Sequence, residues 1–160
     1  MRDTVTRLGG TTLVEKVGNV YLKARMEQDP EILFAGEHSS HYFFPSLGNM
    51  DSGIVAFVLF LEYMSQFELS ATEVIEKYSK YANIEETNYT VHSVSEVIER
   101  IATIFSDGAQ DRTDGLTVSY SDWWVSIRGS SNEPLIRLNI EAKDQATLEI
   151  QKEKMISLIY

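Results

Sequence analysis

Residues 116–142 read LTVSYSDWWVSIRGSSNEPLIRLNIEA, and this stretch decides the fold of the second half of the chain. Apolar and polar residues alternate through three segments, which a turn at Ser121–Asp122 and a loop at 129–134 separate. Because successive side chains of a strand point to opposite faces, such alternation is typical of strands with one buried face. The stretch therefore predicts an antiparallel sheet. Its buried face is expected to carry Leu116, Val118, Tyr120, Trp123, Val125, Ile127, Ile136, Leu138 and Ile140.

Two amphipathic helices are expected on either side of this stretch. Upstream, Ser93 and Glu96 have the spacing of a capping box, and apolar residues follow at helical intervals. Downstream, a helix with an apolar stripe is expected from about Gln145. We therefore expect residues 83–160 to form a complete α+β domain in the order strand, helix, three strands, helix, in which the two helices cover an antiparallel sheet.

The first half, residues 1–82, is expected to be a truncated α/β/α domain, and the polar stretch 83–88 is interpreted as the boundary. The half opens inside a helix that Gly9–Gly10 end, and no strand precedes that helix. Ile54–Met64 is apolar nearly all round, which predicts a helix buried on several sides with its Met and Phe residues in the core. Ser70–Glu73 has the capping-box pattern and opens a helix to about residue 81. The other expected elements are helices at 3–8 and 20–26 and strands at 12–17, 32–34 and 42–44.

Composition and charge exclude several classes of protein. The formal net charge is -10, with 14 Lys and Arg against 24 Asp and Glu, which opposes binding to nucleic acid or to anionic lipid. The chain has no Cys, and therefore no disulfide and no thiolate site. The longest apolar run, Ile54–Leu61, is far shorter than the ~18–20 residues of a membrane span. The N-terminus lacks the plan of a signal peptide, so we expect a cytoplasmic protein.

The first candidate site is the polar loop Gly36–His41. If the loop were extended, Glu37, Ser39 and His41 would point to one side. A carboxylate, a hydroxyl and an imidazole on one side suit the hydroxyls of a sugar. A solvated turn with surface histidines is an equally good interpretation of the composition. A metal site is disfavoured, because His38 and His41 would face opposite sides and no third ligand lies at motif spacing.

The second candidate site is the loop Arg128–Pro134, which reads RGSSNEP. Its guanidinium, hydroxyl, amide and backbone donors can surround a phosphate, and arginine matches two phosphate oxygens with two parallel N–H groups. The alternative is a polar hairpin whose side chains bond to their own backbone. Considered alone, the residues leave both interpretations open.

Together and in this order, the two loops resemble those of the α-D-phosphohexomutase family, of phosphomannomutase/phosphoglucomutase type. That family carries a G-E-x-S-G-H sugar-binding loop before an aromatic strand, then a D-S/G-G helix start, and much later an R-x-S-N-T-E-P phosphate-binding loop. The corresponding segments here are Gly36–Phe44, Asp51–Gly53 and Arg128–Pro134. Similar sequence also surrounds them at Lys16–Asn19 and Leu135–Lys143, so the resemblance covers essentially the whole chain.

The resemblance implies that the chain is the latter part of the third domain and all of the fourth domain of a four-domain enzyme. In that enzyme Glu37 and Ser39 would bind sugar hydroxyls, and His41 would lie beside the reacting hydroxyl as the candidate catalytic group. Gly18 and Asn19 match a further substrate-contacting loop. The phosphate that is not transferred would be held by Arg128, Ser130, Ser131 and Asn132.

At several positions this sequence departs from the family pattern, which limits the assignment of the family's residue roles to this chain. Ser40 stands where the family has glycine, so this turn must accommodate a side chain, and Ser131 and Asn132 replace an Asn-Thr pair. The phosphoserine loop, T-A-S-H-N-P, and the metal loop, D-G-D-x-D-R, do not occur in these 160 residues. Phosphoryl transfer needs an in-line nucleophile and a cation. We therefore expect this chain to bind no cofactor or metal of its own and to be catalytically silent alone.

By resemblance, the complete enzyme interconverts hexose 1-phosphate and 6-phosphate through a bisphosphate intermediate, with Mg²⁺ and a hexose bisphosphate activator. The expected partners of this chain are a hexose phosphate and either the missing N-terminal domains or a second copy. We expect the Glu37 turn and the Arg128 turn to hold opposite ends of one phosphorylated hexose. His38, where amino-sugar relatives often carry glutamine, favours mannose or glucose. The alternatives are a stand-alone sugar-phosphate-binding or interaction module without catalysis, and a zinc enzyme centred on His38 and His41.

Overall fold

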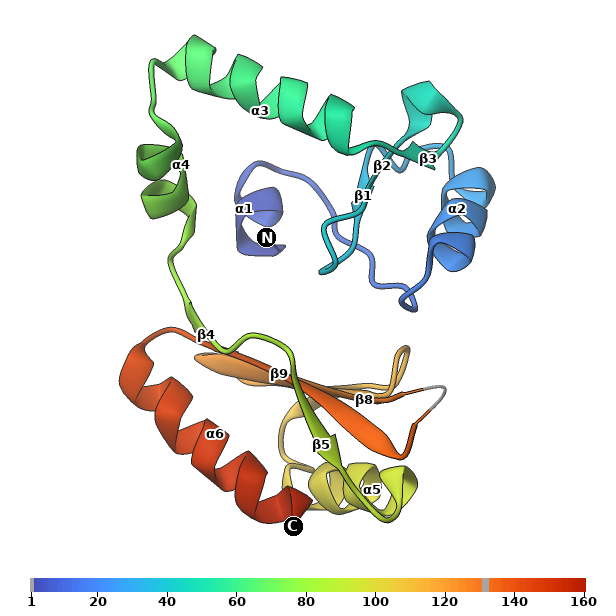
Figure 1. The fold of residues 1–160 in the computed structure, drawn as a ribbon, viewed down its shortest axis with the longest axis vertical. Coiled ribbons are helices and arrows are strands. Elements are labelled where there is room, and N and C mark those ends of the chain that lie inside the picture. Colours follow the sequence, from blue (N-terminus) through green and yellow to red (C-terminus); the bar gives the residue numbers. More distant parts are fainter. Residues whose placement is uncertain (1, 131–132) are drawn as a thin grey trace. The chain divides into compact units, whose positions relative to one another are not determined.

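The computed structural model describes residues 2–130 and 133–160. The chain divides into two compact units, Met1–Glu68 and Leu69–Tyr160, and each unit contains its own sheet (Figure 1). None of the described helices is by itself long and apolar enough to cross a membrane. Only α3 (Gly53–Phe67) and α4 (Ala71–Tyr78), taken together across a bend of 94°, have that length and composition.

The second unit is organised around one antiparallel sheet, in which the strand order is β4-β9-β8-β7-β6 and β5 also pairs with β9. Its centre is the long pairing of β8 with β9, which sets Val125 opposite Ile140 and Ile127 opposite Leu138. Burial alternates residue by residue along β9, so the predicted period-two pattern is confirmed. The strands are β4 (Ala82–Asn83), β5 (Thr87–Thr90), β6 (Ala109–Asp111), β7 (Leu116–Ser119), β8 (Trp123–Gly129) and β9 (Leu135–Ala142).

Two helices, α5 (Val94–Ile104) and α6 (Gln145–Ile159), cover one face of this sheet (Figure 1). The Ser93 hydroxyl caps α5 by accepting the backbone N–H of Glu96. The predicted α+β arrangement of a sheet under two helices is therefore confirmed. Each large aliphatic side chain buried between the layers contributes about 1.5–3 kcal/mol to stability. The core includes Val97, Ile101, Phe105, Leu116, Val118, Val125, Ile127, Ile136, Leu138, Ile140, Leu148, Met155 and Ile159.

Two short strands of this sheet, β4 and β6, lie outside the sequence prediction. β4 and the start of β5 overlap the polar stretch 83–88, and both pair with β9. β6 precedes the predicted strands and pairs with β7. These segments carry no clear alternation, because their exposed side chains face solvent. Their strand conformation comes from the backbone hydrogen bonds of the neighbouring strand, which no local sequence pattern reports.

The first unit has a much smaller sheet, in the order β1-β2-β3. Its buried residues are Met26, Phe43 and Phe44. Gly9 takes a left-handed φ of 83° and ends α1 as predicted, with the Gly10 N–H donating to the Val5 carbonyl at 2.9 Å. The elements are α1 (Arg2–Arg7), α2 (Asn19–Gln28), β1 (Ala35–Gly36), β2 (Tyr42–Phe44), a 3₁₀ turn (Pro45–Leu47), β3 (Met50–Asp51) and α3 (Gly53–Phe67).

Two predicted strands of this unit are wrong. Residues 12–17 are described and form no strand, and residues 32–34 precede β1 instead of forming a buried strand. Leu33 is 85% exposed, so this segment is not in a core. Short apolar runs of β-branched and aromatic residues become strands only when a neighbouring strand accepts their backbone groups. Among the described residues, these two segments have no such neighbour.

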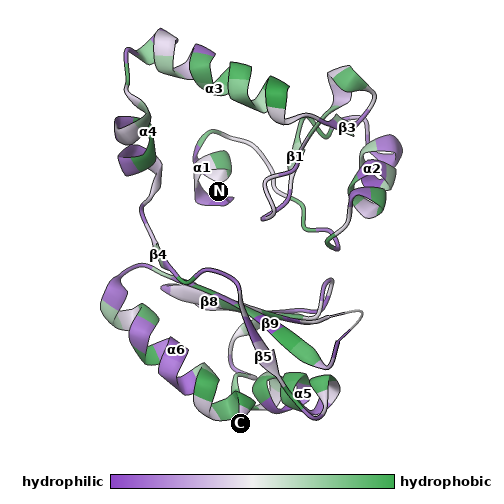
Figure 2. Ribbon diagram, viewed as in Figure 1, coloured by the Kyte–Doolittle hydropathy of each residue, from purple (hydrophilic) through white to green (hydrophobic). Residues whose placement is uncertain are grey.

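The prediction that α3 is buried on several sides is also wrong for this chain. None of its residues is buried by the described residues, and Ile54 and Phe57 are 79% and 59% exposed. Figure 2 shows α3 as a largely hydrophobic helix along much of its length. The apolar sequence indicates that α3 is suited to burial, but burial requires other helices or strands to pack against it on several sides. An apolar surface of this kind marks an interaction surface in soluble proteins.

This difference between the units predicts unequal hydrogen exchange along the chain. Backbone amides of α3 should exchange at least roughly 100-fold faster than those of β8 and β9, because no buried side chain holds α3 against local opening. Hydrogen exchange followed by mass spectrometry at several protein concentrations measures both sets. Equal protection in a monomeric sample would contradict the expectation. Protection of α3 that rises with concentration would show that a second copy covers it.

Candidate functional site

The first candidate loop is the tight connection between β1 and β2. The Glu37 N–H donates to the His41 carbonyl at 2.9 Å, and the Ser40 N–H donates to the Glu37 carbonyl at 3.1 Å. Ser40 has a φ of 66°, in the left-handed region that favours glycine. The loop is therefore a turn, so the extended conformation in which Glu37, Ser39 and His41 would share one side is not the one it adopts. The turn does accommodate a side chain at Ser40, as the sequence requires.

The turn nevertheless brings Glu37, Ser39 and His41 together. The Ser39 Oγ lies 3.0 Å from Glu37 Oε2 and 3.0 Å from His41 Nδ1, and His41 Nδ1 lies 3.1 Å from Glu37 Oε2. Glu37 is nearly buried, with 9% of its side chain exposed, whereas His41 is 54% exposed. Nδ1 accepts a hydrogen bond from Ser39 when it lacks a proton and donates one to Glu37 when it carries one. The group therefore offers a carboxylate acceptor beside a hydroxyl and an imidazole.

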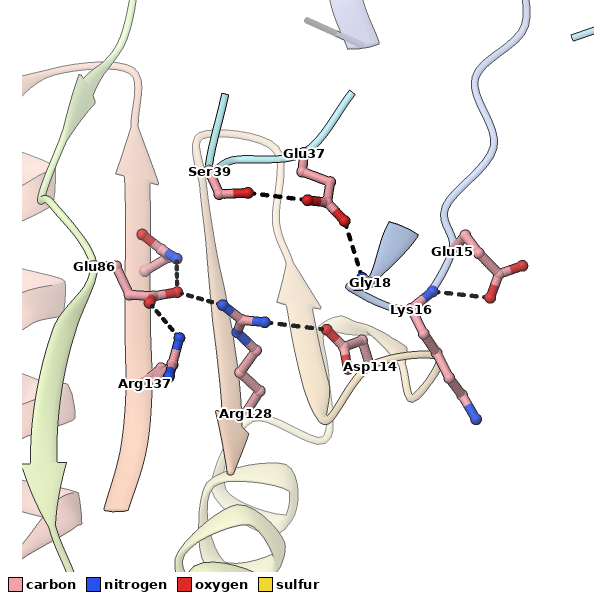
Figure 3. A network of polar contacts seen from close by, with 10 residues as sticks. Glu15, Lys16, Gly18, Glu37, Ser39, Glu86, Asp114, Arg128 and Arg137 are labelled. Atoms are coloured by element: carbon pink, nitrogen blue, oxygen red, sulfur yellow. Dashed lines mark hydrogen bonds and ion pairs between the residues drawn. The ribbon is translucent and has the colours of Figure 1, made fainter. Parts of the chain in front are cut away.

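Glu37 also connects this turn to an earlier loop. The Gly18 N–H donates to Glu37 Oε1 at 3.0 Å, so both carboxylate oxygens have partners (Figure 3). Gly18 has a φ of 132° and immediately precedes α2, which places Asn19 at the first helical position. A pocket of about 250 Å³ lies here. It is lined by Val17, Gly18, Asn19, Glu37, His41 and Asp51.

Four residues that the sequence singled out thus line one pocket, and Asp51 is a lining residue that the analysis missed. In the sequence, Asp51 stands out only as the first residue of the segment Asp51–Gly53 at the start of a helix. Ser52 caps that helix, α3, and its hydroxyl accepts the Val55 N–H at 3.2 Å. Asp51 reaches the pocket because β3 pairs with β2, opposite Phe43. The sequence feature that could have indicated this role is the position of Asp51 shortly after the β1–β2 hairpin. His38 is exposed and does not line the pocket.

The second candidate loop begins at the end of β8. Arg128 occupies the β8 position opposite Arg137 of β9, and the Ser130 N–H donates to the Leu135 carbonyl at 2.9 Å. The expected phosphate-binding residues Ser131 and Asn132 lie outside the described residues. The Arg128 side chain is largely buried, with 21% exposed. The described part of the loop therefore belongs to a hairpin that carries a largely buried arginine at its base.

Arg128 is held by acidic partners that the sequence analysis missed. Its Nη2 lies 2.8 Å from Glu86 Oε2, and its Nη1 lies 3.9 Å from Asp114 Oδ2 (Figure 3). Glu86 also pairs with Arg137, whose Nη1 lies 3.3 Å from Oε1. In the sequence, Glu86 belongs to the polar stretch 83–88 that is interpreted as the boundary. Only the pairing of β5 with β9 brings it beside the arginines.

Opposing effects act on the Glu86 carboxyl. Partial burial raises its pKa, but the hydrogen bond and charge of Arg128, together with those of Arg137, outweigh burial and hold the pKa below its ordinary value. Glu86 is therefore ionised at neutral pH, and it contributes to folding stability through these two ion pairs.

The described residues provide no metal centre. Within residues 2–130 and 133–160, no three His, Asp or Glu side chains converge in a way that could hold an ion. Glu37, His41 and Asp51 share a pocket, but they do not form such a group. The donors of the described residues therefore do not fit Mg²⁺.

Family comparisons match the chain over almost its full length. The model of phosphoglucomutase/phosphomannomutase alpha/beta/alpha domain III matches residues 1–81. The model of the phosphoglucomutase/phosphomannomutase C-terminal domain matches residues 82–158. The order of the two matches is the order in which the two candidate loops occur.

Similar proteins are much longer than this chain. A phosphomannomutase of Methanocaldococcus jannaschii is 32% identical over 158 residues, which are 98% of this chain and 35% of that protein. A phosphomannomutase of Salmonella typhimurium is 31% identical over 97% of the chain and 35% of its own length. A solved phosphoglucomutase/phosphomannomutase family protein of Burkholderia thailandensis has the same fold, with a TM-score of 0.79 at 24% identity over 98% of this chain and 34% of that one. The chain thus spans about a third of the length of these proteins.

The left-handed Ser40 predicts a stabilising substitution. A non-glycine residue in this region costs about 1–2 kcal/mol, part of which is offset by the greater unfolded-state entropy of glycine. Ser40→Gly should therefore slow exchange of the Glu37 amide roughly two- to fivefold. Ser46→Gly, at an exposed position without a positive φ, is the control and should not slow it. If Ser40→Gly does not slow exchange of the Glu37 amide, the turn is not strained at this residue.

The ion pairs of Glu86 predict a pH-dependent stability. The folded-state pKa of Glu86 lies below its unfolded value, so its contribution is complete above the unfolded pKa and is lost as pH falls through the folded pKa. Glu86→Gln should be less stable than the wild type at pH 7, and the difference should shrink below about pH 4.5. Urea unfolding followed by the fluorescence of Trp123 and Trp124, both in the second unit, measures it. A difference that is constant from pH 7 to pH 3 would contradict the assignment.

Proposed function

Because the chain belongs to the phosphoglucomutase/phosphomannomutase family, we propose that it binds hexose phosphates as part of an enzyme that interconverts hexose 1-phosphate and hexose 6-phosphate. In this proposal the reaction passes through a hexose bisphosphate. The Glu37 turn binds the sugar hydroxyls, and the Arg128 turn binds the phosphate group that is not transferred.

The observation that carries the sugar-binding proposal is the pairing of both Glu37 oxygens. Glu37 is held by Gly18 on one oxygen and by Ser39 and His41 on the other, at distances between 3.0 and 3.1 Å. Such a carboxylate is fixed in place before a ligand arrives, so little conformational entropy is lost on binding. A sugar hydroxyl can donate to the carboxylate and accept from the neighbouring imidazole. His41 is also the group that this arrangement offers for proton transfer, because its imidazole lies beside the carboxylate and the hydroxyl.

The phosphate-binding proposal depends on Arg128. A guanidinium supplies several N–H groups in one plane, and its hydrogen bonds to phosphate are charge-assisted. Arg128 is already oriented by Glu86, and the turn that follows it contains Ser130. By the family resemblance, Ser131 and Asn132 add further donors. These residues position an anion and leave the transfer chemistry to other groups.

We further propose that the phosphoserine and the Mg²⁺ of the complete reaction lie outside these 160 residues. The sequence contains neither the phosphoserine motif nor the metal motif of the family, and the described donors do not fit a metal. The exposed apolar surface of α3 supports an accompanying proposal about partners. It is covered either by a further part of a longer chain or by a second copy of this one.

Calorimetric titration with mannose 6-phosphate, glucose 6-phosphate and the two 1-phosphates tests the function. The wild type should bind, and Glu37→Gln and Arg128→Gln should each weaken binding at least about tenfold, because each removes a charge-assisted hydrogen bond. His38→Gln, in the same turn but outside the pocket, is the matched control and should bind as the wild type does. In a coupled mutase assay with magnesium and bisphosphate, the chain alone should show no turnover.

Three results would contradict these proposals. Failure of the wild type to bind any of the four hexose phosphates would remove its basis. Equal affinities of Glu37→Gln and His38→Gln would show that the carboxylate does not contact the sugar. Turnover by the chain alone would overturn the proposed location of the catalytic groups.

A further inference from the structure

Strand register places Asp51 on the same face of the first-unit sheet as His41 and Glu37. Asp51 of β3 is the register partner of Phe43 in β2, and directly opposite residues of a strand pair share a face. His41 lies two residues before Phe43 and therefore belongs to that face, which makes it a diagonal neighbour of Asp51. Glu37 joins them because its N–H donates to the His41 carbonyl at 2.9 Å. All three residues line the same pocket of about 250 Å³.

The backbone of Asp51 is held on both sides. Before it, β3 pairs with β2, whose Phe43 is completely buried. After it, the Ser52 N–H donates to the Tyr42 carbonyl at 3.0 Å, and the Ser52 hydroxyl accepts the Val55 N–H as the cap of α3. Asp51 itself is exposed. Its carboxyl group is therefore accessible to a ligand and sits on a backbone that needs no further ordering on binding.

The two carboxylates of this pocket differ in their hydrogen bonds. One oxygen of Glu37 accepts the Gly18 N–H at 3.0 Å (Figure 3). The other oxygen lies 3.0 Å from the Ser39 hydroxyl and 3.1 Å from His41 Nδ1. Among the described residues, no group forms a hydrogen bond or ion pair with the Asp51 side chain. An ionised carboxylate accepts on two oxygens, so Asp51 presents a fully open acceptor in the pocket.

The charge of the pocket decides which part of a hexose phosphate can occupy it. Its described lining includes the carboxylates of Glu37 and Asp51 and the imidazole of His41, with no lysine or arginine. Two carboxylates without a fixed cation repel a phosphate group. They accept hydrogen bonds from hydroxyl groups. The ring hydroxyls of the ligand therefore fit this pocket, and the phosphate does not.

We propose that Asp51 is a second sugar-binding carboxylate, which accepts a hydrogen bond from a ring hydroxyl that Glu37 does not bind. This inference rests on the proposed binding of hexose phosphates at the Glu37 turn. Glu37 comes from the β1–β2 turn and Asp51 from β3, so the two acceptors are fixed by different segments. A site built to accept from a hydroxyl strongly rejects an analogue that lacks it. Asp51 is thus a specificity-determining residue for the pattern of ring hydroxyls.

Titration of the full chain with glucose 6-phosphate, and with the four analogues that each lack one ring hydroxyl, tests this role. Asp51→Ala should bind glucose 6-phosphate at least about tenfold more weakly than the wild type, and Asp51→Asn, which keeps an acceptor oxygen, should be intermediate. For the analogue that lacks the hydroxyl held by Asp51, Asp51→Ala and the wild type should bind equally, within about twofold.

Glu31→Gln is the matched control, because it removes one exposed carboxylate of the same unit that does not line the pocket. It should bind all five ligands as the wild type does. The tryptophans lie in the second unit, so hydrogen exchange of the β2 amides confirms that the first unit of each variant is folded.

The outcomes separate this inference from the proposed function. If Glu37→Gln weakens binding but Asp51→Ala matches Glu31→Gln, the inference is overturned and the proposed function stands. A wild type that binds none of the hexose phosphates overturns both. Loss of affinity by the same factor for glucose 6-phosphate and all four analogues would show that Asp51 contacts no hydroxyl. Relief of Coulomb repulsion alone would tighten binding of an anionic ligand, so tighter binding by either Asp51 variant would also overturn the inference.

Discussion

The pairing of β8 with β9 governs the second unit in two ways at once. Because side chains alternate across a strand, the register that sets Ile127 opposite Leu138 in the core also sets Arg128 opposite Arg137 on the outer face. A slip of one residue would expose the core and bury the arginines. The large hydrophobic contribution of the core therefore enforces the arrangement of the polar face, and the arginine pair is maintained by packing that it does not itself supply.

Glu37 and Glu86 have comparable structural roles in their separate units. Glu37 is nearly buried and accepts from a backbone N–H of an earlier loop, whereas Glu86 joins two arginines from neighbouring strands. In each case a carboxylate uses both oxygens to hold groups that come from different parts of the sequence. Burying a carboxylate is costly unless its hydrogen bonds are satisfied, so a partly buried carboxylate with both oxygens paired indicates a site that the fold maintains. Both carboxylates lie beside the groups that the proposed function requires.

The parts of the fold that the sequence predicts are those that depend on local periodicity. The alternation through residues 116–142 and the caps at Ser70 and Ser93 are satisfied within a few residues, and the structure confirms them. The strands expected at 12–17 and 32–34 fail because a strand needs a partner for its backbone. The prediction that α3 is buried fails for a similar reason. Its apolar residues need other elements packed against them, and the described residues do not provide these.

The grouping of Glu37, Ser39 and His41 was inferred from an assumed extended chain, yet it arises from a turn in which Ser40 is left-handed. By itself, the sequence determined the family, the α+β unit and the positions of two polar loops, because these depend on residue order and local pattern. Only the tertiary structure decided that Gly18 and Asp51 lie at the Glu37 pocket and that Glu86 and Arg137 lie at Arg128. The physical reason is that such contacts are set by strand pairing and loop closure between distant residues, and neither leaves a periodic signal in the chain.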